Sequence, residues 1–178
     1  MSTQHQQHTR SPTEQYRQLF EQLYNLSVQQ GWGDPFCYAR SREILMANHL
    51  GHYISNMYSG FDAIDQEGNM LEYKSTTHQC INATYNGISV KPTWEQQLRY
   101  LQDDKIAKYK WHFFARFQGA RIYEIWKMSG DCVLELLIPK LYAKFHSNEN
   151  RSDPRLGTSL STTMIRQYGE CIFPQQGS

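Results

Sequence analysis

Apolar residues recur with a helical period near the start of the chain. After Pro12 they stand at intervals that place them along one side of a helix, and Gly31-Trp32-Gly33 ends the run. The residues of this stripe are Tyr16, Leu19, Phe20, Leu23, Tyr24, Leu26 and Val28. Such a stripe packs either against its own domain or against a second subunit, and the sequence leaves both arrangements open.

Three more helices are predicted from apolar spacing and from residues typical of helix ends. Their ranges are 42–50, opened by Ser41 and closed by Gly51; 94–101, opened by Pro92-Thr93; and 132–145, which is rich in leucine. Pro139 falls inside the last helix and should kink or divide it, because proline lacks the N–H that a helix interior needs.

Short apolar runs bounded by turn residues predict the strands. Two runs, 61–64 and 70–73, flank a polar turn, and Asn86-Gly87 predicts the two-residue turn of a second hairpin over 82–90. Further strands are expected at 111–117 and 121–128, with a polar loop over 146–158 and an edge strand from the tail 162–173. Helices thus precede, separate and follow the strands, which predicts a domain of the α/β class.

The first hairpin brings three charged side chains to one face. Gly68 can take the positive φ of a three-residue loop, and a loop at 66–68 makes the numbers of facing residues add to 134. Asp62 then faces Glu72, and Lys74 shares their side because residues two apart on a strand point the same way. Two neighbouring carboxylates repel unless a cation lies between them. Mg²⁺ suits that position, since it prefers one or two carboxylates with water or phosphate oxygens.

An Asp followed after nine residues by Glu-x-Lys across a hairpin resembles the signature of the PD-(D/E)xK nuclease superfamily, to which many type II restriction endonucleases belong. Phe61 stands where the name of the signature has proline, at a position that often varies. The resemblance implies a restriction-endonuclease-like core, a mixed β-sheet flanked by α-helices. It also implies that Asp62 and Glu72 are metal ligands and that Lys74 orients or helps to deprotonate the attacking water.

The same resemblance implies a third acidic residue at the metal site, Glu43, on the helix before the strand that carries Asp62. The expected metal is Mg²⁺, for which Mn²⁺ is expected to substitute. Two plainer interpretations stay open. The hairpin can be a solvated ribbon whose outer face carries three charges, and Glu43 can be an ordinary acidic residue favoured at a helix N-terminus.

Composition narrows the class of protein. At 178 residues, with 39% of them hydrophobic, the chain suits one domain over 13–178 after a polar tail, 1–12, that is expected to be disordered. The net charge is only +1, but residues 1–90 hold 5 Lys or Arg against 8 Asp or Glu, whereas residues 91–178 hold 13 against 9. An acidic half that attracts cations and a basic half that meets phosphates fit a metal-dependent enzyme acting on a polyanion.

Cysteine spacing and hydropathy exclude other classes. The four cysteines are far apart and form no C-x-x-C pair, so neither a zinc ribbon nor a thioredoxin-type site is expected. No run approaches the ~20 apolar residues of a membrane span, and the N-terminus lacks the apolar segment of a signal peptide. We therefore expect a cytoplasmic protein.

Candidate DNA contacts follow the charged hairpin. Ser75 and Thr76 offer hydroxyl groups to a phosphate, although they also suit the start of a loop. Lys105, Lys108 and Lys110 form the densest basic cluster of the chain, which suits phosphate contacts or a solvated surface. The second hairpin is narrow enough to enter a major groove.

The pattern as a whole predicts a Mg²⁺-dependent endodeoxyribonuclease. We expect a type II restriction enzyme that cuts double-stranded DNA as a homodimer, with a methyltransferase acting on the same site. One alternative is a repair, junction-resolving, homing or exonuclease enzyme, because Gln96 and Tyr100 resemble the Gln-x-x-x-Tyr motif of the exonuclease branch of the superfamily. The other is a DNA-binding module without chemistry.

Overall fold

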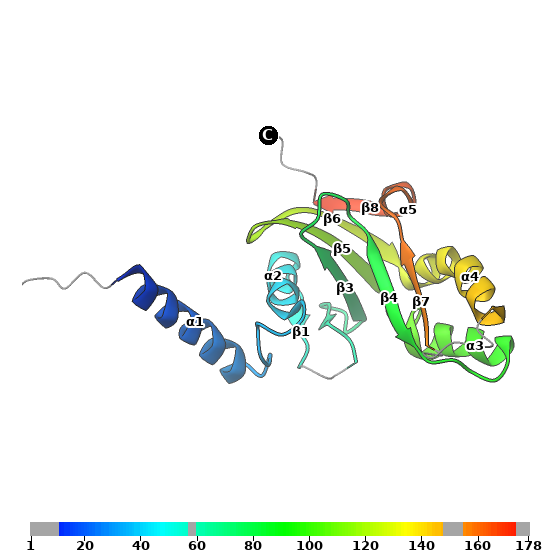
Figure 1. The fold of residues 1–178 in the computed structure, drawn as a ribbon, viewed down its shortest axis with the longest axis horizontal. Helices are drawn as coiled ribbons and strands as arrows, with labels where there is room; N and C mark the ends of the chain where they lie inside the picture. The colour runs from blue at the N-terminus through cyan, green and yellow to red at the C-terminus, as the bar shows by residue number, and fades with distance from the viewer. Residues whose placement is uncertain (1–10, 57–59, 148–154, 174–178) are drawn as a thin grey trace, which may run out of the picture.

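A computed structural model gives the structure of residues 11–56, 60–147 and 155–173. The chain has a mixed α/β fold in which helices flank a six-stranded mixed sheet (Figure 1). Most of the tail expected to be disordered, 1–12, lies outside the described residues, while Ser11 caps the first helix and Pro12 begins it. Within the described ranges, no helix has both the length and the apolar character that crossing a membrane requires.

The main sheet has the spatial order β1-β2-β3-β5-β6-β8. Its strands are β1 (Tyr53–Ile54), β2 (Ala63–Ile64), β3 (Met70–Thr76), β5 (Trp111–Gln118), β6 (Arg121–Ser129) and β8 (Glu170–Phe173). Neighbouring strands are antiparallel except β3 and β5, which run parallel and make the sheet mixed. A second, antiparallel sheet consists of β4 (Ala83–Ile88) and β7 (Leu156–Leu160).

The helices lie on both sides of the main sheet and beyond its edge. They are α1 (Pro12–Gln29), α2 (Arg40–Leu50), α3 (Trp94–Tyr100), α4 (Gly130–His146) and α5 (Thr162–Tyr168), and a π-helical turn, η1 (Leu101–Lys105), extends α3. Helix α1 projects from the rest of the molecule, whereas α2 lies against the sheet (Figure 1).

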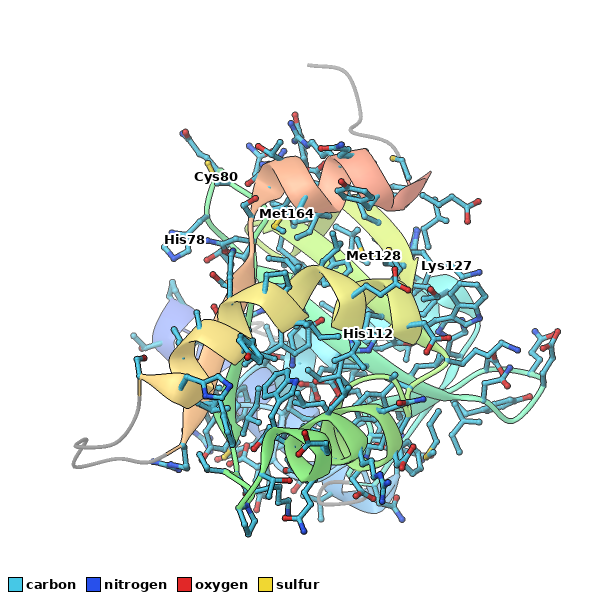
Figure 2. All side chains as sticks on the ribbon, turned by 90° about the vertical axis from the view of Figure 1, so that its right-hand side faces the viewer. His78, Cys80, His112, Lys127, Met128 and Met164 are labelled. Carbon is cyan, nitrogen blue, oxygen red and sulfur yellow. The ribbon has the colours of Figure 1, made fainter. Side chains whose placement is uncertain are left out.

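Alternation along β3 divides the interior into two layers. Leu71 and Tyr73 point toward α2 and pack with Met46 and Ala47 of that helix. On the opposite face, Phe114 of β5 belongs to a larger apolar cluster that includes residues of β4, β7, α4 and α5. Figure 2 looks onto that side, where α4 and α5 cross in front of the sheet. The charged residues of β3 alternate with its buried ones and point away from α2.

The prediction of a hairpin over 82–90 is wrong. Its residues contribute a single strand, β4, which pairs with β7 instead of with itself. Gly87 does have a positive φ, 66°, but it lies between Tyr85 and Ile88, where the register of the two strands shifts. A positive φ serves a bulge as well as a turn, and the pairing with the distant β7 decides between them.

The polar loop predicted over 146–158 is wrong in part. Its last residues belong to β7, which begins at Leu156, and 148–154 lie outside the described residues. The helix before this region, α4, runs through Pro139 without division. Pro139 lies on the exposed side of α4.

The edge strand predicted over 162–173 is shorter than expected. It begins only at Glu170, because α5 occupies the first part of the segment. Ser161 caps α5 by accepting a hydrogen bond from the Met164 N–H at 3.3 Å. Such a cap favours a helix over the extended backbone that the sequence pattern suggested.

Candidate active site

The β2–β3 hairpin has the register predicted from its turn. Ala63 is opposite Leu71, so the numbers of facing residues add to 134. Asp65 holds the turn, because its carboxylate accepts hydrogen bonds from two backbone N–H groups of the loop at 3.0 and 2.9 Å. Gly68 has the positive φ that the loop requires, 84°. Local turn chemistry therefore fixes which side chains share a face of this hairpin.

Asp62 lies immediately before β2 and is held from two directions. Its N–H donates to the Leu71 carbonyl at 3.0 Å, and its carboxylate accepts the Tyr73 N–H at 2.7 Å. Burial raises the pKa of Asp62, and the negative charges of Glu72 and Glu43 raise it further, to about 7. Glu43 and Glu72 therefore repel the ionised form of Asp62, and the positive charge of Lys74 does not fully offset this repulsion.

Lys74 forms an ion pair with Glu72, two residues earlier on β3. Its ammonium also lies 5.2 Å from the centre of the Tyr85 ring on β4. Burial lowers the pKa of Lys74, but Glu72, Asp62 and Glu43 together raise it more, so the pKa lies above its ordinary value. Lys74 is therefore an ammonium at neutral pH, suited to orient a water molecule or a phosphate oxygen and not to remove a proton.

Glu43 reaches this group from the first turn of α2 and is oriented by Arg40. The Arg40 Nη1 lies 3.1 Å from Glu43 Oε2, its Nε donates to the Trp32 carbonyl at 2.7 Å, and its Nη2 donates to the Ser55 carbonyl. Arg40 is only 5% exposed, so its planar guanidinium is fixed among three acceptors. Sequence reasoning missed Arg40, because nothing local reveals which distant carbonyls a buried arginine binds.

A cavity of about 300 Å³ opens beside these carboxylates. Glu43, Asp62 and Glu72 all line it, together with Lys105 and Tyr109 from the segment that follows α3. In the parts of the chain that the structure describes, no three His, Cys, Asp or Glu side chains are close enough to enclose a metal ion. The cavity is thus an acidic recess with basic and phenolic groups on its wall.

A π-helical turn brings Lys105 to the cavity. The turn η1 is closed by an N–H to carbonyl bond of 2.8 Å across five residues, and such turns often occur at functional sites. Tyr109 follows, and its hydroxyl donates to the Gly60 carbonyl at 2.6 Å. Burial raises the pKa of Tyr109, and Glu72 and Asp62 raise it further, so Tyr109 stays protonated. The sequence indicated Tyr109 only as an aromatic residue among the lysines of the basic cluster, and its place beside the carboxylates depends on this turn.

The three lysines of the predicted basic cluster separate in the structure. Lys105 lines the acidic cavity, whereas Lys108 and Lys110 line a neighbouring cavity of about 450 Å³ beside the β2–β3 turn. Lys108 is close to the first cavity as well, because its Nζ donates to the Gly60 carbonyl at 3.3 Å. Lys110 is exposed and is not among the residues that line the acidic cavity. The lysines therefore extend from the cavity wall outward.

Ser75 and Thr76 are not among the residues that line the cavity. Ser75 Oγ accepts a hydrogen bond from Arg42 Nε at 2.8 Å on the α2 side of the sheet. Thr76 is buried, and its hydroxyl oxygen accepts the His78 N–H at 3.1 Å. Both hydroxyls serve contacts within the fold at positions where sequence alone suggested a phosphate.

Gln96 and Tyr100 do not line the cavity either. Gln96 is exposed on α3, and the Tyr100 ring has the Lys91 ammonium 4.2 Å from its centre. The two residues share a helix, as expected, but the structure does not bring them into the group of carboxylates.

Although no three acidic side chains of the described residues are close enough to enclose a metal ion, Mg²⁺ requires only one or two carboxylates with water or phosphate oxygens. Asp62 accepts the Tyr73 N–H through Oδ2, and Glu72 pairs with Lys74 through Oε1. Burial is the main cause of the raised pKa of Asp62, and the neighbouring charges of Glu72 and Glu43 add to it. Oxygen donors with excess negative charge are the ligands that Mg²⁺ and Mn²⁺ prefer.

No protein-family model matches the chain, and no curated protein sequence matches it significantly.

Proposed function

We propose that the protein is a Mg²⁺-dependent endodeoxyribonuclease with a restriction-endonuclease-like core. The observation that supports this is the convergence of Glu43, Asp62 and Glu72 on one cavity, with Lys74 paired to Glu72. These side chains come from a helix, a loop and a strand. Their meeting is what the resemblance to the PD-(D/E)xK superfamily implies, and a solvated hairpin would not require it.

Hydrolysis of a phosphodiester requires that water attack phosphorus and release a proton to the solvent, while the bond to the 3′ oxygen breaks and that oxygen takes a proton from a second water molecule. Asp62 and Glu72, with Glu43 beside them, would hold Mg²⁺, which supplies neutralisation of phosphate charge and lowers the pKa of water. Lys74, as an ammonium, would orient the attacking water by donating a hydrogen bond. Lys105 would pair with a non-bridging phosphate oxygen at the same cavity.

The proposed substrate is double-stranded DNA. Lys108 and Lys110 extend the basic wall beyond the cavity, where neighbouring phosphates of a duplex would lie. The β4–β7 ribbon adjoins the site, since Tyr85 of β4 faces the Lys74 ammonium, and a two-stranded ribbon fits a major groove. A type II restriction enzyme that acts as a homodimer, with a methyltransferase for the same sequence, is the more specific proposal.

The test is a digest of circular plasmid and linear phage DNA in the presence of Mg²⁺. Wild type is compared with Lys74→Ala and with a control, Lys91→Ala, which removes the same charge beside the Tyr100 ring and away from the cavity. Discrete bands from wild type and the control, lost in Lys74→Ala, are the expected result and would define a recognition sequence.

Other outcomes separate the alternatives. A lysine-dependent smear, or degradation of linear DNA alone, would replace the restriction enzyme by a repair nuclease or an exonuclease. No cutting of either DNA by wild type, or equal cutting by Lys74→Ala, would overturn the proposed catalytic role of the cavity.

A further inference from the structure

Helix α1 keeps most of its apolar side chains in solvent. It projects from the domain (Figure 1), and its side chains contact the loop that follows. Ser27 Oγ donates to the Gly33 carbonyl at 2.6 Å, and the Phe20 ring stacks on Phe36 with 3.8 Å between ring centres. Six other apolar residues of α1 are widely exposed: Tyr24 at 43% and Val28 at 48%, and four that share one side of the helix, Tyr16 at 70%, Leu19 at 65%, Leu23 at 45% and Leu26 at 50%.

These four residues form a continuous seam. Their spacing of three, four and three residues is that of alternating a and d positions in a coiled coil. Phe20 and Ser27, which contact the following loop, stand beside the seam and not within it. Its own chain leaves the seam uncovered, and the exposed Tyr24 and Val28 lie on another side of α1.

The seam is self-complementary in one orientation. Its positions are symmetric about residue 21, so a second α1 laid antiparallel places Tyr16 opposite Leu26 and Leu19 opposite Leu23 in both halves. A two-fold interface requires such reciprocity, because each copy presents the same surface. Gln22 flanks the seam one residue from its centre. In the antiparallel pair its two copies would therefore lie close together, and both are uncharged.

Charge does not oppose this pairing. Arg17 and Glu21 form an ion pair on α1, with 2.6 Å between Nη1 and Oε1, and both lie off the seam. The side chains at the centre of the seam are leucines. Like charges therefore do not meet across the pairing surface.

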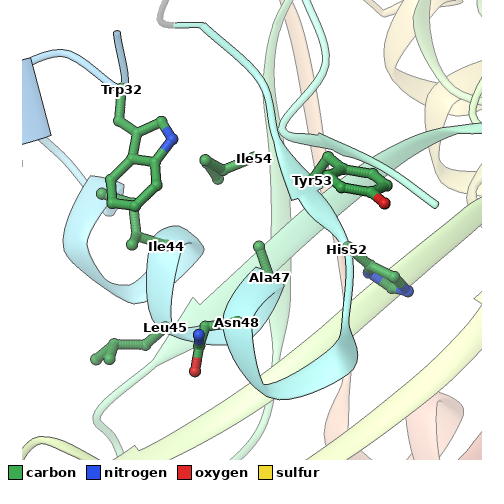
Figure 3. A pocket seen from close by; sticks show the side chains of 8 residues that line it. All are labelled: Trp32, Ile44, Leu45, Ala47, Asn48, His52, Tyr53 and Ile54. Atoms are coloured by element: carbon green, nitrogen blue, oxygen red, sulfur yellow. The ribbon is translucent and has the colours of Figure 1, made fainter. Parts of the chain in front are cut away.

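The chain offers α1 a competing apolar surface. Figure 3 shows a cavity of about 390 Å³ between α2 and β1, with Trp32, Leu45 and Tyr53 among its lining residues. No residue of α1 lines this hollow, and the Phe20 ring stacks on Phe36 instead. The existing contacts hold α1 away from the hollow, which favours a second copy as the partner.

We propose that α1 pairs antiparallel with α1 of a second copy of this chain through Tyr16, Leu19, Leu23 and Leu26. This pairing would form the interface of the homodimer that the proposed function includes. The further consequence, that the dimer cuts both DNA strands, rests on the proposed function. An 18-residue helix is about 27 Å long, so the α1 pair alone gives a small interface. The dimer is accordingly expected to dissociate on dilution.

The first experiment is sedimentation equilibrium of the full chain over a wide range of concentrations, without DNA or metal. Wild type is compared with Leu19→Glu, Leu23→Glu and a control, Asn25→Glu, which adds the same charge on another side of α1. Each seam variant is expected to weaken the dimer by about 100-fold or more, because two buried leucines are lost per dimer. Asn25→Glu should leave the dissociation constant unchanged.

Circular dichroism keeps this test falsifiable, because glutamate has a high helix propensity and the variants should keep their helix content. If α1 instead docks on its own chain, wild type should stay monomeric at all concentrations, and that result would overturn the proposal. A dimer that both seam variants leave intact would overturn it too. Neither result depends on cleavage, so failure of this interface and failure of the nuclease assignment are distinguishable.

A cross-link tests the orientation. In a background with the exposed Cys80 and Cys171 changed to Ser, Gln22→Cys is expected to form a disulfide-linked dimer on mild oxidation. Gln29→Cys, at the end of α1, should not, because antiparallel helices place the two copies of residue 29 at opposite ends. Efficient linking through residue 29 would indicate a parallel pair and would overturn the antiparallel arrangement.

Discussion

The Arg40 guanidinium and the Glu43 carboxylate lie 3.1 Å apart across one turn of α2, and this buried contact aims an acid at the candidate active site. The remaining donors of Arg40 bind the carbonyls of Trp32 and Ser55. One side chain thus joins the loop before α2, the helix itself and the segment after β1. The position of Glu43 therefore depends on contacts that also stabilise the fold.

Arg40→Ala is expected to lower the free energy of unfolding by about 3 kcal/mol, because it leaves a carboxylate and two carbonyls without their buried partner. Urea unfolding followed by tryptophan fluorescence measures this loss. Arg42→Ala is the matched control, since Arg42 binds only the Ser75 hydroxyl among the contacts described above, and it should cost about 1 kcal/mol or less. Equal losses for the two variants would show that Arg40 has no special structural role.

Asp62→Asn is expected to stabilise the protein at pH 8 in the presence of a chelator. The folded state raises the pKa of Asp62 from 3.8 to about 7, so between these values the folded protein binds more protons than the unfolded chain. The contribution of Asp62 to stability therefore falls as the pH rises through this window. Asparagine has no charge and removes the penalty, which is on the order of 2 kcal/mol at pH 8.

The control for this prediction is the pH itself. At pH 4 the folded-state carboxyl of Asp62 is protonated, so wild type and Asp62→Asn should unfold at similar urea concentrations. Added Mg²⁺ or Mn²⁺ should then stabilise wild type at pH 8 and have little effect on the variant, because a ligand stabilises the state that binds it. If the variant were less stable than wild type at pH 8, the ionised Asp62 carboxylate would not destabilise the folded state, contrary to this prediction.

The sequence was most informative where a short local rule decided the structure. Gly68 and the polar turn fix the register of the β2–β3 hairpin, and with it the shared face of Asp62 and Glu72. A mixed sheet flanked by helices also agrees with the prediction. In these places the deciding interactions involve neighbouring residues, so the sequence contains the required information.

Elsewhere the structure depends on distant partners. The Asn86-Gly87 pair has the chemistry of a hairpin turn, yet β4 pairs with β7, whose Thr158 lies opposite Tyr85. The π-helical turn that brings Lys105 to the cavity changes the phase of a helix in a way that apolar spacing does not reveal. The acceptors of Arg40 are likewise set by tertiary packing. These features decide the wall of the cavity, which is why its residues were only partly predicted.

Lys105→Ala should weaken DNA binding more than Lys110→Ala, although both remove one positive charge. Lys105 lines the cavity with the carboxylates, whereas Lys110 is exposed outside it. In a Lys74→Ala background that prevents cleavage, fluorescence anisotropy with duplex DNA should show about a 10-fold loss of affinity for Lys105→Ala at low salt. Lys110→Ala should lose less, and the reverse order would place the phosphate path on the neighbouring cavity.

His112 is expected to make the fold sensitive to acid. It is fully buried, its Nε2 lies 3.0 Å from the Ile106 carbonyl, and its Nδ1 lies 2.9 Å from the Tyr85 hydroxyl. Because a carbonyl only accepts, Nε2 carries the proton and Nδ1 accepts from Tyr85. Burial lowers the pKa of His112 from 6.5 to about 4. The folded protein thus binds fewer protons than the unfolded chain between these values, and stability falls as the pH falls.

The acid effect of His112 is best measured in an Asp62→Asn background, because protonation of Asp62 stabilises the fold over the same pH window and would mask it. From pH 7 to pH 4, this background should lose about 3 kcal/mol through His112. Adding His112→Gln should remove most of that loss, although the variant is expected to be less stable at pH 7 because it disturbs two buried hydrogen bonds. The exposed His78→Gln is the control and should leave the pH dependence unchanged. An equally steep acid dependence after His112→Gln would assign the sensitivity to other groups.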